Sequence, residues 1–163
     1  MMSYDMTTLN YSFLLHEEQQ LIFSSFCRAD ALRLGQIINE VSASYAAPLA
    51  TEIVINGLVV YRYFADAARP DSDLWLRRKR NAVELMHMSS LRFGYWLSEN
   101  GETLESRKLN PNEYAAGGGG MPIVIANTGI IGSVCVSGQP DHLDDHEILV
   151  TAFTRLIAEK CVH

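Results

Sequence analysis

The sequence has few cysteines and no long hydrophobic run. No apolar run approaches the roughly 18 residues that a membrane span needs. The three cysteines are widely spaced and form neither a disulfide framework nor a CxxC metal motif: Cys27, Cys135 and Cys161. Residues 1–5 lack the basic region and cleavage site of a secretory signal. These absences predict a cytoplasmic protein in a reducing compartment.

Positive charge is also scarce. Lysine and arginine number 13 against 19 acidic residues, which gives a net charge of −6. This balance argues against a general nucleic-acid binder and against a protein that binds anionic membranes. With 48% hydrophobic and 20% charged residues the chain is typical of globular proteins. We expect one domain over residues 1–163, with residues 1–15 as an amino-terminal arm because they carry few helix or strand signals.

The first two thirds of the chain predict a strand, a helix, a hairpin and a long helix. Residues 21–26 are a short strand-like run, and Asp30 can cap a helix that ends before Pro48. Asn56-Gly57 lies between two apolar runs and predicts a β-hairpin, since both turn positions need positive φ. A single long helix is predicted over residues 73–99, with this core face: Trp75, Ala82, Met86, Ser89, Phe93 and Leu97. Residues 101–116 follow as a long loop of the kind that is often functional or mobile.

The last third predicts a second hairpin and a final helix. The two runs at 121–126 and 130–136 are apolar on both alternating faces, which is typical of central strands covered by helices on both sides. Asp141 can cap the final helix, and Asp144 and Asp145 suit the positive end of its dipole. Two hairpins favour a mixed or antiparallel sheet, so the chain predicts an α+β fold in three layers.

Four glycines, Gly117 to Gly120, precede the second hairpin. A phosphate-binding loop would need a following lysine and a helix, whereas Met121-Pro122 and a strand follow here. The favoured interpretation is a flexible or tightly packed entry into a central strand. Backbone amides that line a small-molecule or subunit contact are the remaining alternative.

His142 and His146 lie four residues apart, so one face of the final helix could present two metal ligands. The sequence assigns no third ligand. The alternative is a capped helix start whose polar side chains face solvent or another subunit.

Arg77 to Arg80 form the one dense basic patch, and on a helix these side chains point around most of the circumference. Solvation or interface ion pairs are the favoured interpretation. Because Arg78 and Lys79 follow Trp75 by three and four residues, recognition of an anionic ligand such as a carboxylate is the alternative.

The combined motifs resemble the GlcG/HbpS-like family, the haem-degrading-domain proteins. The resemblance covers about residues 20–160 and rests on three runs in this sequence: Gly118-Gly119-Gly120-Met121-Pro122-Ile123, Ile131-Gly132-Ser133-Val134-Cys135-Val136-Ser137-Gly138, and Asp145-His146. The run from Asp73 to Lys79, with Ser89, Ser90 and Gly94, looks like the uncharacterised cytoplasmic branch of that family.

The resemblance implies a profilin-like α/β/α domain with a five-stranded antiparallel sheet, assembled as a homo-oligomer. It also implies haem or small-cofactor binding in some members. We therefore rank three hypotheses: a cytoplasmic module that binds a small anionic or planar ligand, an assembly or adaptor protein without a ligand, and a metal-assisted enzyme that uses His142 and His146. No reaction and no catalytic residue is specified. The predicted ligand-binding residues are Trp75, Arg78, Lys79, Gly118, Gly119, Gly120 and His146.

Overall fold

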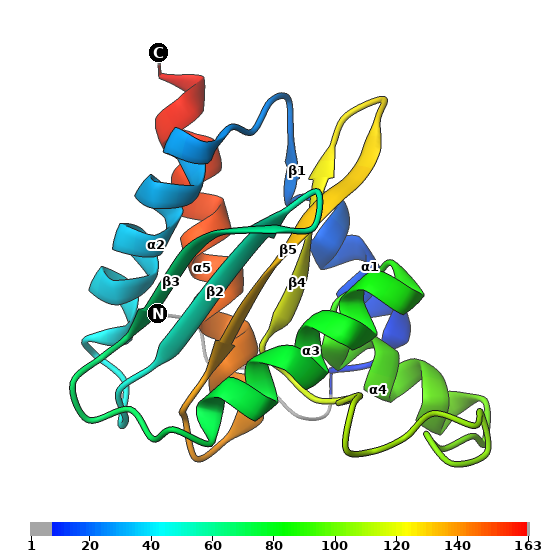
Figure 1. The fold of residues 1–163 in the computed structure, drawn as a ribbon. Coiled ribbons are helices and arrows are strands. Elements are labelled where there is room, and N and C mark those ends of the chain that lie inside the picture. The colour runs from blue at the N-terminus through cyan, green and yellow to red at the C-terminus, as the bar shows by residue number, and fades with distance from the viewer. Residues whose placement is uncertain (1–7, 163) are drawn as a thin grey trace.

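A five-stranded sheet with helices on both faces forms the centre of the computed structural model, which describes residues 8–162 (Figure 1). The strands lie in the order β1-β4-β5-β2-β3. Helices α2 and α5 cover one face and α3 lies on the other (Figure 1). The elements are α1 Tyr11–Gln19, β1 Ile22–Phe23, α2 Arg28–Ser42, β2 Ala50–Ile55, β3 Leu58–Phe64, α3 Ser72–Met86, α4 Ser90–Glu99, β4 Gly120–Ile125, β5 Gly129–Ser137 and α5 His142–Cys161.

The predicted three-layer α+β fold is confirmed, including both hairpins and the final helix. The turn between β2 and β3 has positive φ at Asn56 (49°) and Gly57 (82°), as the Asn-Gly pair predicts. Asp141 caps α5 by accepting a hydrogen bond from Leu143 N at 2.9 Å. None of the helices in residues 8–162 combines the length and the hydropathy that a membrane crossing requires.

The sheet is mixed, so the prediction of a fully antiparallel sheet was wrong. β1 pairs in parallel with β4, through Ile22 with Val124 and Phe23 with Ile125, whereas the other pairings are antiparallel. β1 has only two residues, and the chain after it continues into α2 rather than turning back as a hairpin. A strand that pairs in parallel with β1 can follow only after a long connection. No local sequence pattern predicts which later strand that is.

The predicted long helix over residues 73–99 is in fact two helices. His87 adopts the left-handed conformation (φ 55°) after α3, and the Ser89 side chain caps α4 by accepting from Arg92 N at 3.0 Å. The buried Glu18 carboxylate of α1 accepts hydrogen bonds from Ser89 N and Ser89 Oγ. The backbone N–H of Ser89, which the break leaves without a partner inside a helix, thus finds its acceptor on α1. Trp75, predicted as core, is 44% exposed.

Helix α1 occupies part of the segment predicted as an arm. It begins after Asn10, whose side chain accepts from Phe13 N at 2.8 Å. Residues 1–7, the rest of the predicted arm, lie outside the described residues. Leu14 on α1 is fully buried against Leu91 of α4 and Leu143 of α5, so α1 is packed onto the domain.

The two faces of the sheet differ in chemistry. The face toward α2 and α5 carries the main apolar core, which includes Leu34, Ile38, Ile53, Ile123, Val134 and Phe153. The face toward α3 holds a smaller apolar cluster of Ala50, Leu76 and Cys135, and beside it a buried carboxylate, Glu52. Arg62 and Arg80 pair with Glu52 at 3.0 and 2.7 Å. The ion pair of Arg80 with Glu52 thus connects α3 to the sheet.

Candidate functional site

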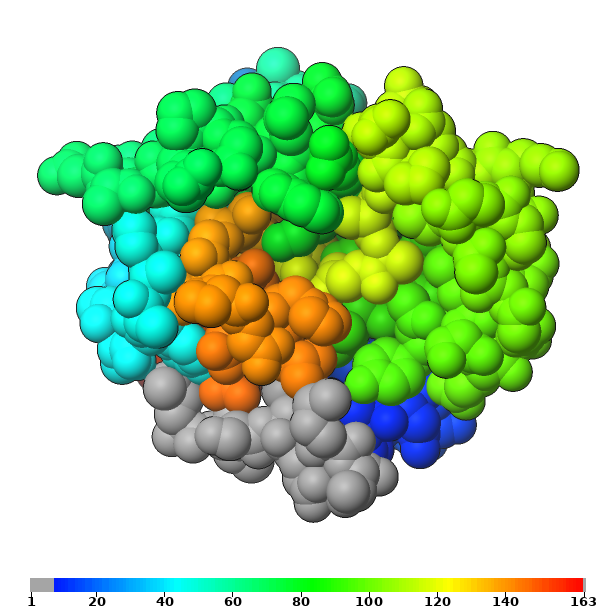
Figure 2. Space-filling model, turned by 90° about the horizontal axis from the view of Figure 1, so that it is seen from below, coloured from blue at the N-terminus to red at the C-terminus, as the bar shows by residue number. Residues whose placement is uncertain are grey.

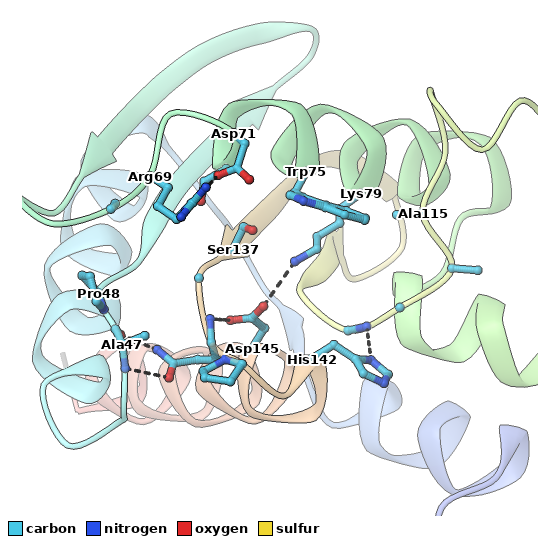
Figure 3. Close-up of a pocket in the computed structure, with 18 of the residues that line it drawn as sticks. Ala47, Pro48, Arg69, Asp71, Trp75, Lys79, Ala115, Ser137, His142 and Asp145 are labelled. Atoms are coloured by element: carbon cyan, nitrogen blue, oxygen red, sulfur yellow. Dashed lines mark hydrogen bonds and ion pairs between the residues drawn. The ribbon is translucent and has the colours of Figure 1, made fainter.

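A cleft of about 760 Å³ opens between α3 and the amino-terminal end of α5 (Figure 2). Its other walls are the β3–α3 loop, the β5–α5 turn and residues 110–118, which we call the strap. Trp75, Lys79, His142 and Asp145 line it together with small residues of the strap (Figure 3).

A buried ion pair lies on the floor of the cleft. Lys79 Nζ donates to Val136 O at 2.8 Å and lies 3.3 Å from Asp145 Oδ2, while Asp145 Oδ1 accepts from Gln139 N at 3.2 Å. The two side chains are 7% and 4% exposed. Burial raises the pKa of Asp145 to about 6, although the Lys79 ammonium opposes that shift. A pair that costs this much to desolvate contributes little to stability and is typical of functional sites.

His142 lies at the edge of the cleft and contacts the strap (Figure 3). Its Nδ1 accepts a hydrogen bond from Gly118 N at 2.9 Å. Removal of water from part of the ring lowers the pKa of His142, and Lys79 lowers it further. The ring is therefore neutral near pH 7, and because Nδ1 accepts, the ring proton lies on Nε2. His142 is therefore an uncharged side chain at the edge of the cleft.

Glycine is required at positions 118 and 119 because the backbone there packs closely against the floor of the cleft. A Cβ atom at Gly119 would lie 2.5 Å from both Lys79 Nζ and Val136 O, and the residue has a φ of +124°. A Cβ atom at Gly118 would lie 2.1 Å from His142 O. The interpretation as a tightly packed entry into a strand is confirmed, although β4 is the second strand of the sheet rather than the middle one.

We predict that Gly119→Ala destabilises the protein more than Gly129→Ala does. Gly129 has a comparable φ of +111° but no atom within 4 Å of an added Cβ, so it reports backbone strain alone. At Gly119 overpacking against Lys79 and Val136 adds about 1–3 kcal/mol to the loss in the free energy of unfolding. Urea denaturation of both variants measures the difference, and equal losses would contradict it.

The four basic residues of α3 lie in different surroundings. Arg77 is exposed, Lys79 reaches the cleft floor, and Arg80 pairs with Glu52. Arg78 lies 4.7 Å over the Trp75 ring and donates from Nε to Asn112 O at 3.0 Å. Arg78 thus joins the strap to the aromatic wall of the cleft.

His146 does not line the cleft. It is fully buried, and its Nε2 lies 2.8 Å from Glu17 Oε1 of α1. His142 Nδ1 is engaged by the strap, and no group of three potential metal-ligating side chains occurs in residues 8–162. The structure therefore adds no third ligand to the predicted histidine pair.

Of the predicted ligand-binding residues, the cleft brings together Trp75, Lys79 and Gly118, while Gly119 lies against Lys79. Gly120 is buried where β4 begins. Sequence reasoning missed Asp145 as a cleft residue, because an aspartate in the first turn of a helix is ordinary for dipole reasons alone. It also missed Tyr114, which lies in a loop without any periodic signal.

Comparison with known proteins identifies the family. The model of the HbpS-like family, described as "Haem degrading protein HbpS-like", matches residues 26–154. The UPF0303 protein SCO2848 of Streptomyces coelicolor is 36% identical over 144 residues, which cover 88% of this chain and 90% of that protein.

Two solved structures share the fold. The crystal structure of the Ybr137w protein superposes with a TM-score of 0.84 at 23% identity and covers 94% of this chain and 91% of that one. The PduOC:heme complex superposes with a TM-score of 0.62 at 19% identity, over 80% of this chain and 95% of that one. At these identities the likeness extends to the fold. On the match of residues 26–154 to the family model, the chain belongs to the HbpS-like family, and its sequence is also similar to UPF0303 proteins.

Proposed function

We propose that this protein is a small-molecule-binding protein whose cleft holds a planar ligand with an anionic group. The observation that carries the proposal is the position of Lys79, a buried ammonium on the floor of the cleft, on the same helix as the exposed Trp75. Residues four apart on a helix share one face, so α3 presents a cation and an aromatic ring to the same space.

The size and lining of the cleft support a small organic ligand. Its volume of about 760 Å³ lies within the range of roughly 300–1,000 Å³ that is usual for ligand sites. Trp75 is one of only two tryptophans, and 44% of it remains exposed on the cleft wall. Exposure of so large an aromatic ring beside convergent polar groups is typical of binding surfaces. The amino-terminal end of α5 also opens here, and its dipole favours a negative group.

The fit to haem is only partial. The volume and the aromatic wall suit a planar molecule with carboxylates, and one fold neighbour is titled as a heme complex. Of the usual axial ligands, the cleft lining contains His142 and Tyr114. A neutral histidine that ligates through Nε2 carries its proton on Nδ1 and donates it, whereas Nδ1 of His142 accepts from Gly118 N. Iron ligation by His142 therefore does not fit this arrangement of protons.

Tryptophan fluorescence tests the proposal because the only other tryptophan, Trp96, lies outside the cleft lining. We expect benzoate to quench the wild-type protein and Trp96→Phe but not Trp75→Phe, and we expect indole-3-carboxylate and haemin, which absorb or emit at these wavelengths themselves, to bind in calorimetry. Calorimetry should give an affinity about tenfold weaker for Trp75→Ala, a loss typical of an aromatic anchor. If no member of this panel binds, or if Trp75→Phe retains the quench, the cleft is not the ligand site.

Haemin provides a second readout. If haemin binds as a planar anion, His142→Ala should leave the Soret band of the complex unchanged. If His142→Ala abolishes the Soret band, His142 is an iron ligand, and its ring proton does not lie on Nε2 in the complex.

We also propose that the protein is a cytoplasmic homo-oligomer. The exposed apolar residues of the edge strand β3, which are Leu58, Val59 and Tyr63, support a contact between subunits there. Native mass spectrometry of the untagged protein reports the number of subunits together with any co-purified ligand.

A further inference from the structure

The Lys79–Asp145 pair permits a sharper statement about the ligand, which rests on the proposed function. We propose that Lys79 Nζ binds the carboxylate of the ligand and that Asp145 is an internal counter-ion which this carboxylate displaces. The chemical class of ligand is an aryl or short arylalkyl carboxylate.

The contacts of Lys79 leave it able to accept a second anion. An ammonium has three protons. One is donated to Val136 O at 2.8 Å, and a second is directed to Asp145 Oδ2 at 3.3 Å. The distance to Asp145 exceeds the roughly 2.7–2.9 Å of a strong charge-assisted hydrogen bond. Within residues 8–162, Lys79 Nζ makes no third hydrogen bond.

Asp145 is held by contacts that do not depend on Lys79. Its Oδ1 accepts from Gln139 N at 3.2 Å, and the Gly138 N–H also stabilises the carboxylate. The side chain can therefore stay in place when Lys79 turns to a ligand. The other charged or titratable groups that line the cleft near this pair are His142 and the Arg69–Asp71 ion pair, while Asp141 acts on His142. His142 is neutral, so Asp145 is the carboxylate that competes most directly for the Lys79 ammonium.

Stability does not account for the pair. Burial raises the pKa of Asp145 even with Lys79 beside it, so the ionised carboxylate is less favourable in the folded than in the unfolded chain. Replacement of such buried pairs by apolar residues is often neutral or stabilising. A buried cation with a loosely held counter-ion at the bottom of an open cleft is instead suited to exchange one anion for another.

The helix geometry of α3 sets the class of ligand. Trp75 and Lys79 are four residues apart on α3, so their Cβ atoms lie about 5–6 Å from each other on one face. Because both side chains line the same cleft, an aryl or short arylalkyl carboxylate is the class that can place a ring at Trp75 and a carboxylate at Lys79 Nζ. A Cβ atom at Gly119 would lie 2.5 Å from Lys79 Nζ, so glycine at this position leaves room for the ammonium.

Calorimetry with benzoate and its neutral analogue benzamide tests the assignment. We expect the wild-type protein to bind benzoate at least tenfold more tightly than benzamide. Asp145→Asn should strengthen benzoate binding about tenfold, because the competing carboxylate is gone. Lys79→Met should weaken it at least tenfold. The double variant Lys79→Met/Asp145→Asn leaves no unpaired charge, so it should fold and still fail to bind benzoate.

Each outcome separates the two proposals. A folded double variant that binds benzoate as the wild type does would overturn the role of Lys79, while the cleft could still be the ligand site. Binding that weakens in Asp145→Asn, or in Asp145→Ser if the first variant does not fold, would overturn the role of Asp145. If benzoate and benzamide bind equally well and both depend on Trp75, the cleft binds planar ligands but does not recognise the carboxylate. Failure of both probes to bind would remove the ligand class itself.

Discussion

We expect Lys79→Met to lower the free energy of unfolding by about 3–5 kcal/mol at pH 7.5, the range for removal of one partner of a buried ion pair. The reason is that Asp145, whose side chain is 4% exposed, would keep a buried charge without a counter-ion. Urea denaturation at pH 7.5 measures the loss. Exposed ion pairs of the same protein, such as Arg107 with Glu102, should contribute about 1 kcal/mol or less.

The size of this loss depends on pH, and its sign follows from the raised pKa of Asp145. The folded wild-type protein binds a proton at Asp145 with a pKa of about 6, whereas the unfolded chain does so near 3.8. Between these values the folded state holds more protons, so the contribution of Asp145 to stability falls as pH rises from about 4 to about 6. Lys79→Met raises the folded pKa of Asp145 further and extends that fall to higher pH. The variant should therefore lose much less stability at pH 5 than at pH 7.5.

The double variant Lys79→Met/Asp145→Asn separates this electrostatic effect from packing. With both charges removed, it should recover most of the stability that Lys79→Met loses at pH 7.5, and its difference from the wild type should vary less with pH. A double variant as unstable as Lys79→Met would mean that the packing of the Lys79 side chain, rather than its charge, is what the fold requires.

Glu18→Ala should be the second large loss, again about 3–5 kcal/mol in the free energy of unfolding. Glu18 lies on α1 and accepts from Ser89 N at 2.9 Å and from Ser89 Oγ at 3.0 Å, and it pairs with Arg92 Nε at 3.0 Å. The Glu18 and Arg92 side chains are 9% and 10% exposed. Truncation would leave a buried cation and the start of α4 without their partner.

Chemical denaturation of Glu18→Ala and Glu18→Gln distinguishes the charge from the hydrogen bonds. The glutamine keeps an acceptor for Ser89 and should lose clearly less stability than the alanine. Glu102→Ala, which breaks the exposed pair with Arg107, is the matched control and should change stability by about 1 kcal/mol or less. A Glu18→Ala variant as stable as this control would show that α1 does not stabilise the break between α3 and α4.

The sequence by itself determined the local structure and the family. Asn56-Gly57 defined a hairpin because few residue pairs accept positive φ at two successive positions. Asp141 marked the start of α5, and apolar alternation on both faces marked strands covered by helices. These signals are readable because each reports the preference of a few neighbouring residues. The glycine run helped to identify the family, but the sequence did not explain why glycines are needed there.

Tertiary structure alone decided the break between α3 and α4 and the composition of the cleft. At the break Ser89 N donates to Glu18 Oε1, which lies 71 residues earlier in the chain, and no pattern near Ser89 predicts such a partner. Lys79 and Asp145 are 66 residues apart, and each has an ordinary local explanation, as one of four basic residues and as a first-turn aspartate. Only the packing of α3 and α5 around the end of the sheet turns them into a buried pair on the floor of a cleft. The physical reason is that burial and pairing between distant segments, rather than residue type, determine the chemistry of an ionisable group.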